Sequence, residues 1–63
     1  MYTGIKVKLI GEDGNIFNLI GICCQALRRH KKYDLIDKFY QDINHSKDYT
    51  EALGKITTWF DVE

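Results

Sequence analysis

The stretch GEDGNIFNLIGICCQALRRHKK, residues 11–32, decides the fold of this chain. It opens with a turn in which Asp13 or Asn15 can accept hydrogen bonds from the free amides of a first helical turn. Residues 16–27 are then apolar on more than one face of a helix, whereas a surface helix keeps a polar back. We therefore predict a central helix covered on several sides, with Gly21 marking a close approach by another element.

The two ends of the chain carry the only segments with strand character. Apolar residues alternate with polar ones over residues 5–10, which predicts a half-buried strand. This strand needs a partner for its backbone groups, and residues 60–63 alternate in the same way. We expect the two ends to meet, with Lys6 and Lys8 across from the two acids of the C-terminal segment.

Two further helices are predicted between these ends. Apolar residues recur at helical spacing over residues 34–43, and a polar break follows at residues 44–47. Asp48, with Glu51 three residues later, is a variant of the capping box and predicts a third helix that reaches Trp59. The sequence thus predicts a single α+β domain over the whole chain, in the order β-α-α-α-β, with antiparallel neighbouring helices.

Length and composition restrict the function. With 63 residues, the chain forms one domain that buries only about 60% of the surface it exposes when unfolded. A core of this size leaves little room for a deep substrate pocket, so we expect no enzyme, no cofactor and no small-molecule substrate. No apolar run approaches the roughly 20 residues of a membrane-spanning helix, and the N-terminus does not resemble a secretory signal. We expect a cytoplasmic protein with no membrane partner.

The thiols and imidazoles invite a metal or catalytic hypothesis. Cys23 and Cys24 are adjacent, so on a helix they diverge instead of converging with His30 and His45 on one ion. Nothing fixes a third group that would orient a Cys-His pair. We predict two buried, reduced core cysteines and no metal site.

A basic cluster closes the central helix and is the strongest candidate for a functional surface. It comprises Arg28, Arg29, Lys31 and Lys32. Through residue 32 the chain has six Lys or Arg and two acids, a net charge of +4, and the remainder has three and seven, a net charge of −4. Such cations attract nucleic acid or an acidic protein surface, but they also complement the dipole at a helix C-terminus. The zero total charge disfavours dedicated DNA binding.

Aromatic residues are abundant for so small a chain, at 13% of the sequence. Most are expected in the core, and a leftover exposed patch would mark a partner surface. We therefore predict a non-enzymatic accessory protein that binds a protein partner or a second copy of itself, with nucleic-acid binding as the alternative. The candidate partner-binding residues are the four cations of the basic cluster together with Tyr33, Tyr40 and Trp59.

The strings KVKLIGEDGNIFNLIG, ALRR and the closing WFDVE carry a resemblance across nearly the whole chain. The chain resembles a set of small uncharacterised bacterial proteins of about this length, some encoded near mobile or phage-derived genes. The resemblance implies a compact domain with paired ends. It implies no activity, cofactor or catalytic residue.

Overall fold

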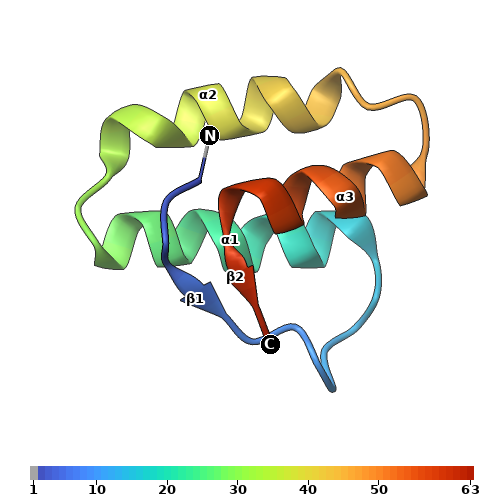
Figure 1. Ribbon diagram of the computed structural model, residues 1–63, viewed down its shortest axis with the longest axis horizontal. Coiled ribbons are helices and arrows are strands. Elements are labelled where there is room, and N and C mark those ends of the chain that lie inside the picture. Colours follow the sequence, from blue (N-terminus) through green and yellow to red (C-terminus); the bar gives the residue numbers. More distant parts are fainter. Residues whose placement is uncertain (1) are drawn as a thin grey trace.

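The computed structural model describes residues 2–63 and has the predicted β-α-α-α-β order. Its elements are β1 (Lys6–Val7), α1 (Ile16–Arg29), α2 (Tyr33–Asn44), α3 (Tyr49–Trp59) and β2 (Asp61–Val62). Figure 1 shows α2 running back against the direction of α1 and α3, with both strands on one side of the helices. The α+β prediction is confirmed. Within residues 2–63, no helix combines the length and apolar character needed to cross a membrane.

The helix starts follow from the predicted caps. The side-chain oxygen of Asn15 accepts a hydrogen bond from the amide of Phe17 at 2.9 Å, which caps α1. Asp48 accepts from the amide of Glu51 at 2.8 Å and caps α3. Each contact satisfies an amide that the first helical turn leaves unpaired, so the two caps fix where α1 and α3 begin.

The end of α1 adopts a tight reversal with a lysine at its turning point. The amide of Lys32 donates to the carbonyl of Leu27 at 2.8 Å, and the amide of Lys31 donates to the carbonyl of Arg28 at 2.9 Å. This is the Schellman pattern, whose turning residue is usually glycine because it is left-handed. Lys31 occupies that position with φ of 58°. A lysine therefore stands where the backbone favours glycine.

The two strands pair in parallel, in a register that places Lys6 opposite Asp61. Regular pairing covers two residues of each strand, which is shorter than the predicted strand over residues 5–10 because the C-terminal segment is itself short. Backbone bonds nevertheless continue, and the amide of Leu9 donates to the carbonyl of Glu63 at 2.8 Å. The ion pair expected across the strands forms diagonally, between Lys6 and Glu63 at 3.9 Å, and both side chains are exposed. It contributes little to stability.

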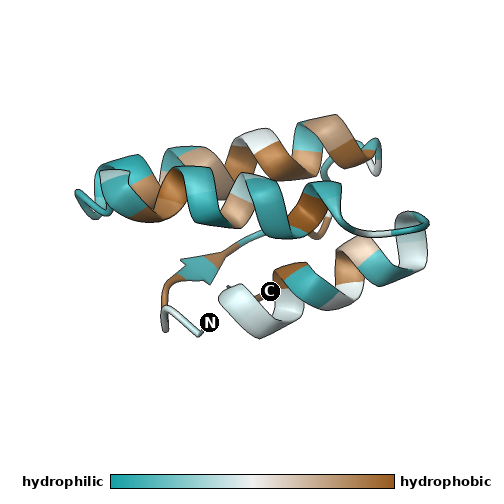
Figure 2. Ribbon diagram, turned by 90° about the horizontal axis from the view of Figure 1, so that it is seen from above, coloured by the Kyte–Doolittle hydropathy of each residue, from teal (hydrophilic) through white to brown (hydrophobic). Residues whose placement is uncertain are grey.

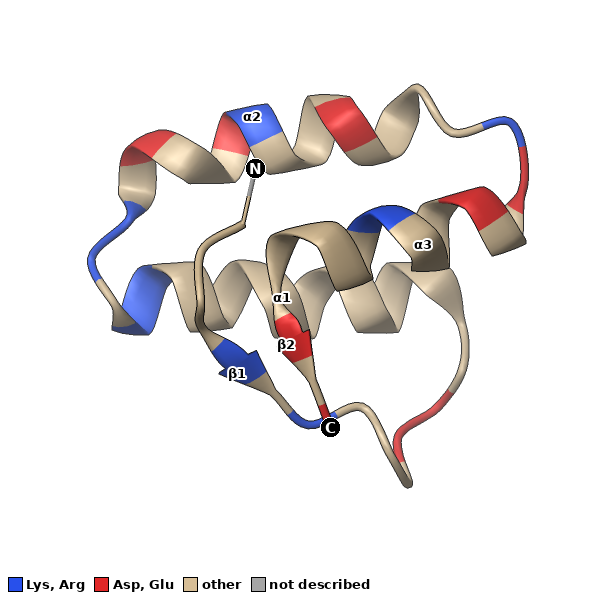
Figure 3. Cartoon of the chain, viewed as in Figure 1, with Lys and Arg blue, Asp and Glu red and all other residues tan. Residues whose placement is uncertain are grey.

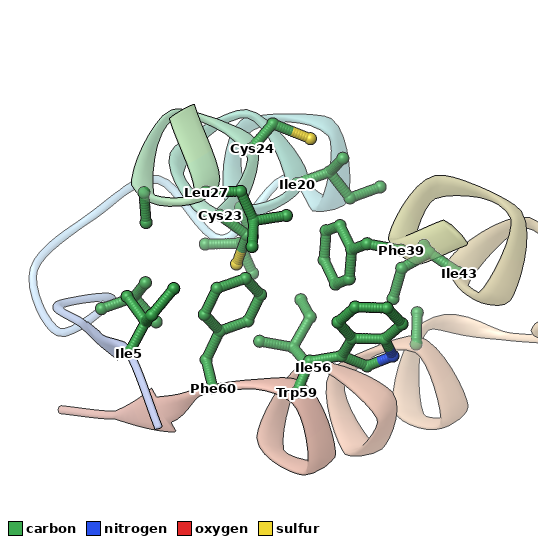
Figure 4. Close-up of a cluster of buried hydrophobic side chains, with 14 residues drawn as sticks. Ile5, Ile20, Cys23, Cys24, Leu27, Phe39, Ile43, Ile56, Trp59 and Phe60 are labelled. Carbon is green, nitrogen blue, oxygen red and sulfur yellow. The ribbon is translucent and has the colours of Figure 1, made fainter. Parts of the chain in front are cut away.

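An aromatic cluster forms the centre of the core. Phe39 of α2 is fully buried and meets the rings of Trp59 and Phe60 edge-on, each at a centroid distance of 5.3 Å. Figure 4 shows these rings between α1 and the end of α3, with Ile56 beside them. Edge-to-face pairs contribute beyond their buried area. In Figure 2 hydrophobic and hydrophilic residues alternate along the helices, as expected where one face packs on such a core.

Asp42 joins α2 to α3 at the edge of this core. The indole Nε1 of Trp59 donates to its carboxylate at 2.8 Å, and Lys55 Nζ donates to its backbone carbonyl at 2.8 Å. The hydrogen bond from Trp59, reinforced by the positive charge of Lys55, lowers the pKa of Asp42 below its usual value. Trp59 is thereby held in the core with its polar atom satisfied.

Candidate functional site

The outer face of α1 is the most distinctive surface of the molecule. Phe17 is 74% exposed although it lies in the apolar run. Gly21, one turn further on, is also exposed, and a Cβ added there would meet nothing within 4 Å. The prediction that another element approaches closely at Gly21 is wrong, whereas α1 does contact α2, α3 and β1 and so is covered on several sides, as predicted. At 3.6 residues per turn, Phe17 and Gly21 share one face, and that face points to solvent.

A hollow of about 490 Å³ lies beside Phe17, between α1 and α2. Its floor includes Ile20 and Cys24, which are 5% and 6% exposed, and Tyr40 of α2 contributes to its wall. We call this surface the Phe17 patch, after the members Phe17, Ile20, Gly21, Cys24, Arg28 and Tyr40; Asn18, Ile22 and Gln25 complete its lining. The missing side chain at Gly21 helps to leave the hollow open.

A second hollow, of about 270 Å³, lies on the other side of Phe17, where α1 meets the loop between α2 and α3. Ile43 and Ala52 contribute apolar atoms to it. The buried hydroxyl of Ser46 also lines it and has no hydrogen-bond partner within residues 2–63. Phe17 therefore projects between two hollows. An exposed apolar side chain flanked by hollows is typical of a surface that binds another macromolecule.

The basic cluster lies at one end of this surface. Arg28, Arg29, Lys31 and Lys32 are all exposed, and none of them forms an ion pair with a carboxylate of residues 2–63. Figure 3 shows this positive end of α1 opposite the acidic turn, residues 12–13, which precedes the helix. The long axis of α1 thus runs from a negative end to a positive end, with the Phe17 patch between them.

The three aromatic candidates separate in the structure. Tyr33 is 62% exposed beside the basic cluster, and Tyr40 is 44% exposed within the Phe17 patch. Trp59 is 3% exposed, because it packs against Phe39 and donates its indole hydrogen to a carboxylate of α2. The expectation that Trp59 belongs to an exposed contact surface is therefore wrong. Besides Tyr2 near the N-terminus, the exposed aromatic residues lie on α1 and α2, with Tyr49 at the start of α3.

The thiols are buried and diverge, as predicted. Figure 4 shows the sulfur of Cys23 directed toward Phe60, and that of Cys24 directed away from it. Burial and the neighbouring thiol raise the pKa of Cys23 to about 12. Burial also raises the pKa of Cys24, against the opposing effect of Arg28. Neither thiol is a ready nucleophile at neutral pH, since the thiolate is the reactive form.

The histidines do not converge with the thiols on a metal site. The Nδ1 atom of His45 lies 2.6 Å from the carbonyl of Gln41, and so engages its own helix. Across residues 2–63 there is no cluster of three or more His, Cys, Asp or Glu side chains that could hold a metal ion.

Phe17 is the candidate residue whose exposure the sequence patterns do not predict, since the apolar run predicts that it is buried. A signal for its exposure was present, because the positions on its helical face after one, two and three turns are Gly21, Cys24 and Arg28, with the polar Gln25 beside Cys24. One face of the apolar run therefore carries glycine, cysteine and arginine, with a glutamine at its edge. Had that face been identified, Phe17 would have stood out as its only large apolar side chain.

A comparison of the chain with protein-family models, curated proteins and solved structures finds no match. The resemblance to small bacterial proteins therefore stays an expectation from the sequence.

Proposed function

We propose that this chain is a non-enzymatic accessory protein that acts by binding another protein through the Phe17 patch. The observation that carries the proposal is the 74% exposure of Phe17 between two hollows lined in part by apolar residues. Full burial of a phenylalanine side chain contributes roughly 1.5 to 3 kcal/mol. A partner that covered Phe17 would gain most of this free energy.

The composition of the patch resembles the centre of a protein interface. Such centres are depleted of charge and enriched in aromatic side chains and arginine, with a polar rim around them. Phe17 and Tyr40 supply the aromatic part, and Arg28 lies at the margin with the rest of the basic cluster beyond it. The partner surface is therefore proposed to be apolar at its centre and acidic at one edge.

We propose no enzymatic activity because the thiols, which would be the nucleophiles, and the side chains of the hollow are poorly suited to catalysis. Burial raises the pKa of both thiols, and that of Cys23 reaches about 12. The hollow beside Phe17 contains one ionisable side chain besides Cys24 and Tyr40, namely Arg28. General acid-base chemistry favours a group whose pKa lies near the working pH, and an arginine stays protonated throughout that range.

The proposal is tested by comparing two serine variants in capture from the cells that make the protein. Phe17→Ser removes the apolar ridge, and Ile10→Ser is a matched control because Ile10 is also 74% exposed but lies after β1. A specific protein partner should be retained by the wild type and by Ile10→Ser and lost by Phe17→Ser. A second copy of the chain counts as such a protein partner. Equal capture by all three proteins would contradict the proposal.

Nucleic-acid binding is the second candidate, and one observation favours it. The four cations of the basic cluster are exposed without a carboxylate partner in residues 2–63, so their charge is available to a polyanion. Binding through phosphates would fall steeply with salt. Arg29→Ala should then weaken the affinity for a short duplex more than Lys47→Ala, which removes an exposed cation elsewhere. Absence of binding to DNA and RNA at low salt would exclude this candidate.

A further inference from the structure

We infer that the Phe17 patch binds a second copy of this chain, with the two α1 helices packed antiparallel about a two-fold axis. The inference rests on the proposed function, because it names the protein that covers the patch. Three features of the structure support it, namely the shape of the patch, the distribution of charge along α1 and the absence of a side chain at Gly21.

The shape of the patch makes it self-complementary. A two-fold interface brings the same surface of both copies together, so it must offer both a projection and a recess. Phe17 is the projection, and the hollow of about 490 Å³ beside it is the recess. A cavity of about 150 Å³ is enough to hold a benzene ring. The hollow therefore has room for the phenyl ring of Phe17 from the other copy.

The charges along α1 select the antiparallel arrangement. The acidic turn, residues 12–13, lies at the start of α1, and the basic cluster lies at its end (Figure 3). A parallel pair would place like charges together at both ends. An antiparallel pair brings each basic cluster to the acidic turn of the other copy, which supplies carboxylates to cations that have none in residues 2–63. Charge complementarity of this kind fixes the orientation of two partners.

The register follows from the centre of the patch. With the axis midway between Gly21 and Cys24, each Phe17 lies opposite Arg28 of the other copy, where a cation-π contact can form. The same axis places the acidic turn, which includes Glu12, on the side of the basic cluster of the other copy, because the turn precedes α1 and the cluster follows its last residues. Because Gly21 has no side chain and a Cβ there would meet nothing within 4 Å, the two helices can approach closely at the crossing.

The size of the surface predicts a dimer of modest affinity. The 14 residues of α1 span about 21 Å, which limits the length of the contact. A standard interface takes about 800 Å² from each partner, and that is close to a fifth of the 4226 Å² surface of this chain. A smaller contact is therefore expected, with a Kd on the order of 10 μM.

Sedimentation equilibrium of the purified chain, combined with a charge exchange, tests this dimer. The wild type should pass from monomer to dimer between about 1 and 500 μM, and dimerisation should weaken as salt rises. Glu12→Lys and Lys32→Glu each replace an exposed charge, and each should weaken the dimer about tenfold because two contacts per dimer become repulsive. The double variant should recover an affinity within about threefold of the wild type, since the exchanged charges again attract.

Circular dichroism melting of each variant checks that the fold is retained, and Lys38→Glu is the matched control for a charge reversal on α2 away from the basic cluster. A monomer at every concentration would overturn the inference, as would a double variant no stronger than the single ones. If the chain is a monomer but the capture experiment finds a partner whose binding depends on Phe17, the inference fails and the proposed function is supported. If Phe17→Ser leaves the dimer intact in sedimentation, the inference is contradicted whatever the capture experiment shows.

Discussion

Replacement of Phe39 by leucine tests whether the aromatic cluster holds the fold together. Phe39 is fully buried and makes two edge-to-face contacts, with Trp59 and Phe60. Each such contact contributes roughly 0.5 to 1.5 kcal/mol beyond burial, so Phe39→Leu should cost about 2 kcal/mol. By per-residue scaling the 63-residue chain has a total stability of roughly 3 to 9 kcal/mol. The melting temperature should therefore fall by about 8 to 16 °C.

Urea unfolding followed by the fluorescence of Trp59 and by far-ultraviolet circular dichroism measures this change. Trp59 is the single tryptophan of the chain and belongs to the cluster, so its signal reports the core directly. The control is Phe17→Leu, which makes the same chemical change at a site that is 74% exposed. At a concentration that favours the monomer it should alter the free energy of unfolding by less than about 0.5 kcal/mol. Equal losses of unfolding free energy in the two variants would show that the ring contacts of Phe39 do not stabilise the fold.

Three further predictions concern charge, thiols and backbone. Because the hydrogen bond from Trp59 and the charge of Lys55 lower the pKa of Asp42, its contribution to stability is present above the ordinary aspartate pKa of about 3.9 and is lost as pH falls through the lower folded value. Urea unfolding between about pH 5 and 2 should therefore show a weaker pH dependence in Asp42→Asn than in the wild type, and equal slopes would contradict the assignment. With its pKa raised to about 12, Cys23 should react with iodoacetamide at pH 8 about 10³-fold more slowly in the native protein than in urea, as mass spectrometry can follow, and rapid native labelling would count against its burial. Lys31→Gly should raise the free energy of unfolding by about 0.5 kcal/mol, since relief of left-handed strain at φ of 58° exceeds the entropic cost of glycine, and a lower melting temperature would argue against that conformation.

The helices were predictable because local chemistry determines them. The cap residues Asn15 and Asp48 stand directly before helical periodicity, and both make the expected side-chain contact with a first-turn amide. The burial of Phe39 follows from its place on the apolar stripe of an amphipathic helix. Pairing of the chain ends was predictable as well, because only two segments show alternation and a strand needs a partner.

The strand direction and the exposed face of α1 were not predictable from the same patterns. Two short strands with alternating residues satisfy their backbone groups in either direction, and only the path of the intervening helices decides for the parallel pairing. Along α1, the apolar run is so dense that periodicity hides the outer face, which explains the misplacement of Phe17. The sequence patterns leave Trp59 among the candidate contact residues, because they carry no sign of its hydrogen bond to Asp42 across α2 and α3.

The outer face of α1 is proposed as a protein-binding surface that a second copy of the chain covers. Amide chemical shifts of the isotope-labelled protein, recorded from dilute to concentrated solution, test it residue by residue. For such a dimer we expect concentration-dependent shifts at Phe17, Gly21 and Arg28 and in the acidic turn, with little change at β1 and β2. Shifts that are independent of concentration, or that gather on the two strands instead, would contradict it.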